Sequence, residues 1–311
     1  MNDSKVITEG ALLTVVYNIL LVVALYFPLV GMIIFFILPI PFIIFASRYN
    51  WKPSLLMGAA AILLSIFIVG GVTMPMTILA AMGGIVTGCA IYKGLSTYET
   101  WAAGTIGFAA GFVFVYAFIQ QVLKINIMEK LDESLNQVLH FIDTLGIASQ
   151  IPDEVYQTFT EQVMMVKDLI PASIVMVSIL FAFVNLWLSY KIKNALEQKQ
   201  VAFPPFRLFN LPTSVIWIYF IALILTFFNL DQQSFLYVGV INVILLGSIL
   251  LTIQGFSLIF CFAHIKKWSK AIPIISVVLG FVLPVLFYLI RILGIIDLGF
   301  SVKHRLSGEK K

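Results

Sequence analysis

Residues 235–263 read FLYVGVINVILLGSILLTIQGFSLIFCFA, a run that contains no acidic or basic side chain. A helix that crosses the hydrocarbon core of a membrane needs about 20 predominantly apolar residues, so this run is long enough to cross. Other apolar runs of similar length precede and follow it. The run therefore predicts a transmembrane helix, and it guides the interpretation of the rest of the chain.

The composition of the whole chain agrees with a membrane protein. Of 311 residues, 61% are hydrophobic and 11% are charged, and the mean hydropathy is +1.04. Soluble domains carry about 25% charged residues, and a soluble fold of this size could not hide so much apolar surface. The composition excludes a soluble enzyme, a disordered chain and a nucleic-acid-binding domain.

The apolar segments indicate an all-α, polytopic transmembrane bundle of about 8–9 spans. They cover approximately residues 10–27, 29–46, 53–70, 73–92, 98–121, 169–190, 213–230, 235–263 and 271–299. The last segment is longer than one crossing needs and too short for two. Gly280 and Pro284 favour a break in it, which would make a re-entrant pair of helices.

The orientation is predicted from lysine and arginine, which concentrate in cytoplasmic loops. Basic residues follow the second, fourth, sixth and eighth segments, as Arg48, Lys93, Lys193 and Lys266 illustrate. We therefore expect a multi-pass protein of the cell (plasma) membrane with a cytoplasmic N-terminus. The basic tail is also expected inside, although nine full crossings would place it outside.

The polar stretch 122–168 then lies outside the membrane. Apolar residues recur at heptad spacing from Met128 to Leu145 and again from Tyr156 to Ile170, which is typical of helices that pack on each other. This spacing predicts an extracytoplasmic helical hairpin, either a spacer between membrane halves or a docking surface. The predicted domains are 1–121, a five-helix membrane half; 122–168, the hairpin; and 169–311, the second membrane half with the tail.

The stretch 192–212 is expected to lie along the inner membrane surface, as a connector or a partner-binding loop.

No catalytic, cofactor or metal motif is present, and His140, His264 and His304 have no ligand partners nearby in sequence. Cys89 and Cys261 are far apart in apolar runs. We expect no enzymatic activity, no cofactor, no metal and no nucleic-acid partner.

Four amide side chains lie within apolar segments: Asn18, Asn185, Asn242 and Gln254. An unpaired amide in hydrocarbon is costly, so each should face the bundle interior. Each could simply hydrogen-bond within the bundle. Together, however, they predict one shared polar cavity that binds a small solute.

Arg291 and Asp297 are opposite charges in the last segment. Charged residues in membrane spans are functional candidates, and we include both as candidate ligand-binding residues. Their spacing of six does not place them face to face on a straight helix. Either residue could instead pair with another helix or lie near the membrane interface.

The order of features resembles a known family. Leu38-Pro39-Ile40-Pro41 is followed by an acidic helical insert, by Phe206-Arg207-Leu208-Phe209-Asn210-Leu211-Pro212 and by Leu293-Gly294-Ile295-Ile296-Asp297-Leu298-Gly299-Phe300. Together these motifs resemble the YybS-type family of multi-pass membrane proteins of bacilli, over essentially the whole chain. The resemblance implies a membrane protein and transfers no catalytic residues.

The N-terminal half is also distantly similar to substrate-binding components of energy-coupling-factor transporters, which capture small solutes and dock on an ATPase. Their Ala-x-x-x-Ala docking motif is not present, because Ala11 is followed by Val15. The sequence leaves two main functions open: a small-solute binding or transport component, or a membrane scaffold or signalling partner that acts through the hairpin or the 192–212 loop.

The predicted topology can be tested by cysteine labelling. Gln150→Cys should react with an impermeant thiol reagent added to intact cells, whereas Gln198→Cys should react only after the cells are opened, because the loops lie on opposite sides. The unsubstituted protein gives the background from the two native cysteines. Reversed labelling would contradict the orientation.

Overall fold

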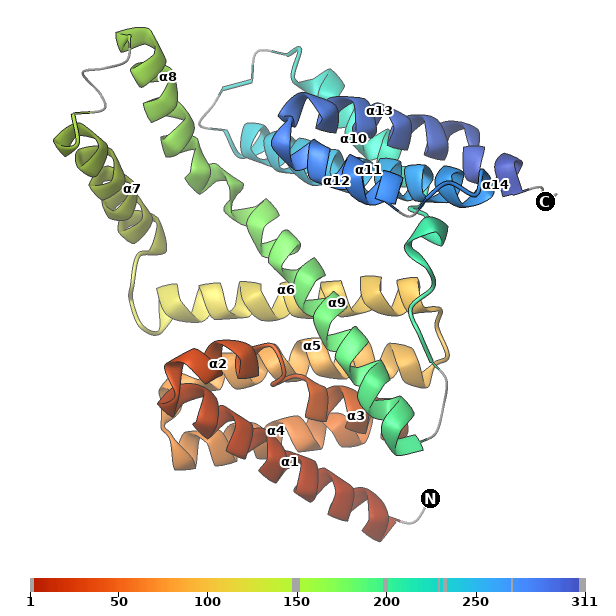
Figure 1. The fold of residues 1–311 in the computed structure, drawn as a ribbon. Coiled ribbons are helices and arrows are strands. Elements are labelled where there is room, and N and C mark those ends of the chain that lie inside the picture. The colour runs from red at the N-terminus through yellow and green to blue at the C-terminus, as the bar shows by residue number, and fades with distance from the viewer. Residues whose placement is uncertain are drawn as a thin grey trace. The chain divides into compact units, whose positions relative to one another are not determined.

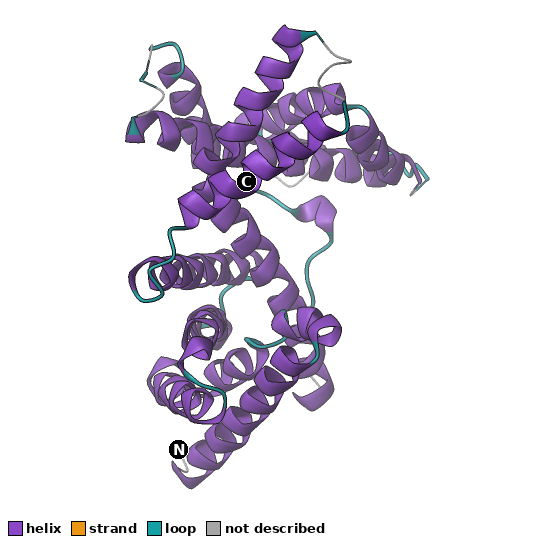
Figure 2. Cartoon of the chain, turned by 90° about the vertical axis from the view of Figure 1, so that its left-hand side faces the viewer, coloured by secondary structure: helices purple, strands orange, loops and turns teal. Residues whose placement is uncertain are grey.

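The fold is described from a computed structural model, which defines residues 3–146, 152–197, 201–228, 230–231, 234–269 and 271–307. Over these residues the chain forms helices joined by loops, with no strand (Figures 1 and 2). The two labelling positions, Gln150 and Gln198, and the side chain of His304 lie outside the described part. The all-α fold class predicted from the sequence is confirmed.

The helices follow one another from Asp3 to Ser307. They are α1 (Asp3–Tyr26), α2 (Pro28–Phe35), α3 (Ile40–Tyr49), α4 (Trp51–Ile68), η1 (Gly71–Thr73), α5 (Met74–Tyr92), α6 (Thr97–Gln121), α7 (Ile127–Thr144), α8 (Asp153–Met164), η3 (Met165–Leu169), α9 (Ile170–Glu197), η4 (Phe206–Leu208), α10 (Ser214–Leu225), α11 (Phe235–Ile265), α12 (Ala271–Val282), α13 (Pro284–Phe300) and α14 (Val302–Ser307).

The chain divides into two compact units, Met1–Phe203 and Pro204–Lys311. The predicted domains placed the sixth apolar segment with the C-terminal half, whereas α9 packs within the first unit. Phe181 of α9 contacts the rings of Phe35 and Phe108, and Trp101 of α6 donates its indole N–H to the carbonyl of Ile179 at 2.9 Å. These long-range contacts could not be read from the hydropathy pattern.

Seven helical segments among the described residues are long and apolar enough to cross a membrane. One of them, Pro28–Tyr49, combines α2 and α3, which are separated by a turn before Pro39. Two of the predicted segments contain shorter apolar helices, Ser214–Leu225 and Ala271–Val282. Several crossings are therefore confirmed, while the number of spans stays a prediction.

The predicted break in the last segment is confirmed. Helix α12 ends at Val282, Leu283 is extended with φ −119° and ψ 90°, and Pro284 opens α13. Proline suits a first helical position because its missing N–H would have no partner there. Helix α13 then packs closely along α11, with Gly294 facing Gly255 at the crossing.

Helices α7 and α8 carry the predicted heptads. Tyr156 donates to a carboxylate oxygen of Asp143 at 2.5 Å, and Lys167 pairs with Asp132 at 3.3 Å. Burial does not follow the predicted heptad at this point. Val138, a predicted heptad position, is exposed, whereas its neighbour Leu139, which is not one, is buried. The hairpin as a packed unit stays a prediction.

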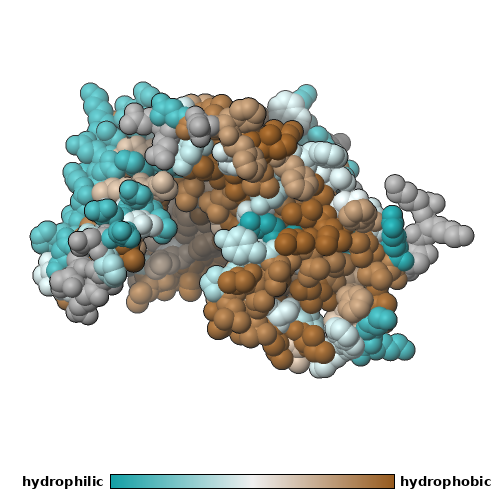
Figure 3. Space-filling model, turned by 90° about the horizontal axis from the view of Figure 1, so that it is seen from above, coloured by the Kyte–Doolittle hydropathy of each residue, from teal (hydrophilic) through white to brown (hydrophobic). Residues whose placement is uncertain are grey.

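Large apolar side chains cover much of the outside of the helices. Leu29, Phe67 and Phe235 are 86%, 90% and 92% exposed. Figure 3 shows one face of the molecule, where brown hydrophobic side chains dominate. Exposed apolar surface on this scale would aggregate in water, whereas lipid tails cover it without cost.

The crossing of α11 and α13 provides a test of close helix packing. A Cβ at position 294 would collide with the carbonyl oxygen of Leu251, a backbone atom that cannot rotate away. Gly294→Ala should therefore lower the free energy of unfolding by about 1–3 kcal/mol or more, measured by thermal unfolding in detergent. Gly299→Ala on the same helix is the matched control, because a Cβ there meets nothing within 4 Å. Equal stability of the two variants would contradict the packing.

Candidate functional site

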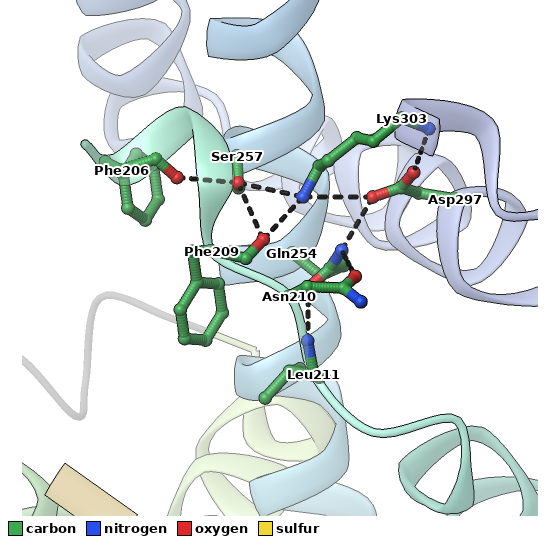
Figure 4. Close-up of polar contacts among 8 residues, drawn as sticks. All are labelled: Phe206, Phe209, Asn210, Leu211, Gln254, Ser257, Asp297 and Lys303. Atoms are coloured by element: carbon green, nitrogen blue, oxygen red, sulfur yellow. Dashed lines mark hydrogen bonds and ion pairs between the residues drawn. The ribbon is translucent and has the colours of Figure 1, made fainter. Parts of the chain in front are cut away.

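A buried ion pair forms where the chain reverses after α13. Ser301 ends this helix in the left-handed conformation, with φ 50° and ψ 47°, and so turns the chain back toward Asp297. The backbone N–H of Lys303 then donates to Asp297 Oδ1 at 3.0 Å, and Lys303 Nζ lies 3.1 Å from Asp297 Oδ2. The side chains are 2% exposed for Asp297 and 10% for Lys303 (Figure 4).

Gln254 of α11 links this ion pair to the loop before α10. Its amide nitrogen donates to Asp297 Oδ2 at 2.6 Å and to Asn210 Oδ1 at 3.0 Å. Its amide oxygen accepts from the backbone N–H of Leu211 at 3.0 Å. Gln254 is fully buried, and both ends of its amide group are used.

The same cluster holds the backbone of the loop. Ser257, one turn along α11, lies 2.7 Å from the carbonyl oxygen of Phe206 and 3.1 Å from that of Phe209. Lys303 Nζ donates to the Phe209 carbonyl at 2.6 Å and to Ser257 Oγ at 2.9 Å. The carbonyl of Phe209, which lies just after η4, thus finds partners, as buried backbone groups require. The carbonyl of Phe206, within η4, also accepts from the N–H of Phe209 at 3.0 Å. We call Asn210, Gln254, Ser257, Asp297 and Lys303 the Asp297 cluster.

The hydrogen-bonding capacity of the Asp297 cluster is largely used. The ammonium of Lys303 has three donors and three acceptors around it, and the Asp297 carboxylate accepts three contacts. Burial lowers the pKa of Lys303, while the Asp297 carboxylate opposes the shift. The arrangement fits a clamp that fixes the loop to α11 and α13 better than a ligand pocket.

Arg291 lies on α13 and does not pair with Asp297. Its Nη1 donates to the hydroxyl of Tyr219 on α10 at 3.2 Å, and its guanidinium lies 5.1 Å from the ring centre of Tyr288. The Nε atom is buried and has no hydrogen-bond partner, and no described carboxylate forms an ion pair with this side chain. No described carboxylate therefore neutralises its positive charge, although Arg291 is half-buried.

The three predicted asparagines are bonded within their own helices. Their amide nitrogens donate to carbonyls four residues earlier: Asn18 to Thr14 at 2.9 Å, Asn185 to Phe181 at 2.9 Å, and Asn242 to Val238 at 2.6 Å. The oxygens of Asn18 and Asn185 are buried and accept no hydrogen bond from the described residues. Gln254, by contrast, hydrogen-bonds to Asn210, Leu211 and Asp297 in other segments. A cavity shared by all four stays a prediction.

The sequence singled out Gln254, Arg291 and Asp297 but missed Lys303, which it treated as a charge of the tail. It also treated residues 206–212 as a surface connector. The available signal was the richness of this loop in proline, because backbone groups outside regular structure must find partners in an apolar setting.

Long apolar helices in both units define an integral, multi-pass membrane protein. The chain belongs to the family described as "Predicted membrane protein (DUF2232)", whose sequence model matches residues 15–298. It is similar to "Uncharacterized protein YybS" from Bacillus subtilis (strain 168), with 30% identity over 312 residues that cover 99% of this chain and 100% of the relative. The resemblance to the YybS-type family is thereby confirmed. No solved structure matches the chain.

The ion pair can be tested by a double-mutant cycle. Asp297→Leu alone should lower the free energy of unfolding by about 3–5 kcal/mol, because the Lys303 ammonium stays buried without its partner. The double variant Asp297→Leu/Lys303→Met should lose clearly less than the sum of the single variants, because it leaves no buried charge without a partner. The measurement is denaturant unfolding in detergent. Additive losses would show that the two charges are not coupled.

Proposed function

We propose that this integral membrane protein is a component of the cell membrane that binds, and in the cell transports, a small solute with an anionic group. The single observation behind the proposal is the Arg291 guanidinium, which lies among apolar helices without a counter-ion. A charge at membrane depth is costly unless it is paired, and such charges mark solute or ion pathways.

The position of Arg291 supports this function. It lies in the middle of α13, its hydrogen-bond partner Tyr219 lies in the middle of α10, and Ser248 lies near the middle of α11, with its hydroxyl 3.5 Å from that of Tyr219. Three helices therefore bring donors together away from their ends. A snorkelling arginine would lie near a helix terminus instead.

The chemistry of the Arg291 guanidinium suits an anionic ligand. A guanidinium presents donors in a planar fork that matches carboxylate and phosphate oxygens. The Tyr219 hydroxyl accepts from Arg291 and Ser248, so its own proton is a further donor beside the guanidinium. Asp297 cannot neutralise Arg291, because its oxygens are occupied by Lys303 and Gln254. The Arg291 side chain is only half-buried, so part of it stays accessible.

Transport is supported by the break between α12 and α13, since discontinuous helices hold the solutes of many transporters. We also propose that the N-terminus is cytoplasmic. The N-terminal half is proposed to be distantly similar to substrate-binding components of energy-coupling-factor transporters. Docking on an ATPase is not proposed, because the alanine motif is not present.

A second candidate is a membrane scaffold or signalling partner. The local hydrogen bonds of the asparagines favour it, since they make the amides helix-stabilising groups rather than cavity walls. Helices α7 and α8 also expose apolar side chains, with Phe141 62% and Val155 54% exposed. In the predicted topology these helices stand outside the membrane, where exposed apolar side chains are typical of a protein-binding surface.

Small anions test the solute proposal. We expect sodium phosphate, acetate or citrate to raise the unfolding temperature of the purified full-length protein above that in sodium chloride of equal ionic strength. Arg291→Gln should weaken the response to the stabilising anion at least about tenfold in apparent affinity, because a charge-assisted bidentate contact is lost.

Arg305→Gln is the matched control, since it removes an exposed arginine of the same unit and should leave the response unchanged. If no anion stabilises the protein, or if Arg291→Gln responds like the unsubstituted protein, the solute proposal is wrong and the scaffold function is preferred.

A further inference from the structure

A cleft of about 480 Å³ lies in the second unit, away from Arg291. It is bounded by η4, the C-terminal end of α11 and the start of α12. Three basic side chains, Arg207, His264 and Lys267, line it together with apolar side chains that include Phe206, Trp268 and Ile274.

The charge in this cleft is unbalanced. None of its lining residues is acidic, and no described carboxylate forms an ion pair with Arg207 or Lys267. Apart from the three basic groups the lining is mainly apolar. A ligand that fits this combination has an anionic group joined to a hydrocarbon part.

The cleft lies where a membrane helix leaves its apolar run. Helix α11 stays apolar up to Ala263, and basic residues begin at His264. Lys267 then takes a left-handed conformation with φ 55°, and the N–H of Trp268 bonds back to the carbonyl of Ala263 at 2.9 Å. Tryptophan and basic residues gather at membrane–water interfaces, on the cytoplasmic side for the basic ones.

We propose that this cleft binds the headgroup of an anionic phospholipid from the inner leaflet. Arg207 and Lys267 would contact the phosphate, and the first acyl segment would lie against Phe206 and Ile274. The cleft is too small for a whole lipid. Exposed apolar residues of α12, such as Ile275 and Val278, continue its apolar wall and would carry the acyl chains.

The apolar walls favour a lipid over a free phosphate, because a soluble anion would leave them uncovered. One wall is also held in place by the Asp297 cluster. The carbonyl of Phe206 accepts from Ser257, and its ring packs edge-on against Phe260 with centroids 5.3 Å apart. The cleft is therefore a built feature of the second unit rather than a chance gap between mobile side chains.

The experiment uses purified full-length protein in detergent and three probes: dioctanoyl phosphatidylglycerol, dioctanoyl phosphatidylcholine and sn-glycerol 3-phosphate. Thermal unfolding gives an apparent affinity for each, and native mass spectrometry counts bound lipids. In the Arg291→Gln variant, which lacks the proposed solute site, only phosphatidylglycerol should stabilise the protein. Arg207→Gln/Lys267→Gln should weaken its affinity at least about tenfold, because each basic residue near a membrane surface contributes about fivefold.

Lys266→Gln is the matched control. It removes the adjacent lysine, which lies over the ring of Phe262 and does not line the cleft, so lipid affinity should stay unchanged. Arg291→Gln should also keep the lipid response, which separates this site from the proposed solute site. If the double variant does not fold, Ile274→Trp fills the cleft at constant charge and should abolish lipid binding.

Several outcomes would overturn the proposal. Equal stabilisation by phosphatidylcholine would show that the charge is not recognised. Equal stabilisation of the Arg291→Gln variant by glycerol phosphate would indicate a soluble phosphate compound as the ligand of the cleft. An equal loss in Lys266→Gln would reduce the effect to general surface charge, and full lipid binding by Ile274→Trp would place the lipid elsewhere.

Discussion

Each polar group that this chain places in an apolar environment needs a hydrogen-bond partner, because an unpaired one is costly. Helices meet this requirement for the backbone, because each N–H bonds to a carbonyl of the same helix. The same rule explains the asparagines, whose amide groups bond to carbonyls four residues earlier. Backbone groups at helix ends and in loops have no such partner within a helix. The second unit contains two places where this matters.

The loop before α10 is the first of these places. It is rich in proline and forms only the short helix η4, so backbone groups such as the carbonyl of Phe209 and the N–H of Leu211 need partners on other segments. Gln254 and Ser257 are one helical turn apart on that helix and reach the loop from the same side. The reversal after α13 is the second place, and Lys303 serves both, since it pairs with Asp297 and donates to the carbonyl of Phe209. One buried ion pair thus fixes two irregular segments.

Physical limits decide how much of this arrangement the sequence could predict. Hydropathy predicted the membrane class, and Pro284 predicted the break between α12 and α13, because both signals are local. The position of α9 in the first unit depends on ring contacts of Phe181 with distant helices, which hydropathy does not encode. For the asparagines the sequence left two alternatives, a shared cavity or hydrogen bonds within the bundle, and hydropathy cannot tell them apart. The structure shows each amide nitrogen bonded to the carbonyl one turn earlier on the same helix. Lys303 was missed because its role depends on the left-handed turn at Ser301.

Lys303 and Arg291, two cations of the second unit, differ in a way that bears on function. Lys303 is nearly surrounded by acceptors, and its charge is neutralised by a carboxylate 3.1 Å away. Arg291, six residues before Asp297 on α13, has a tyrosine hydroxyl, an aromatic ring and an unpartnered Nε. A requirement for stability alone would favour an apolar residue at position 291, because an unneutralised charge among apolar helices is costly. The contrast fits a structural role for Lys303 and agrees with the proposal that Arg291 binds an anionic solute.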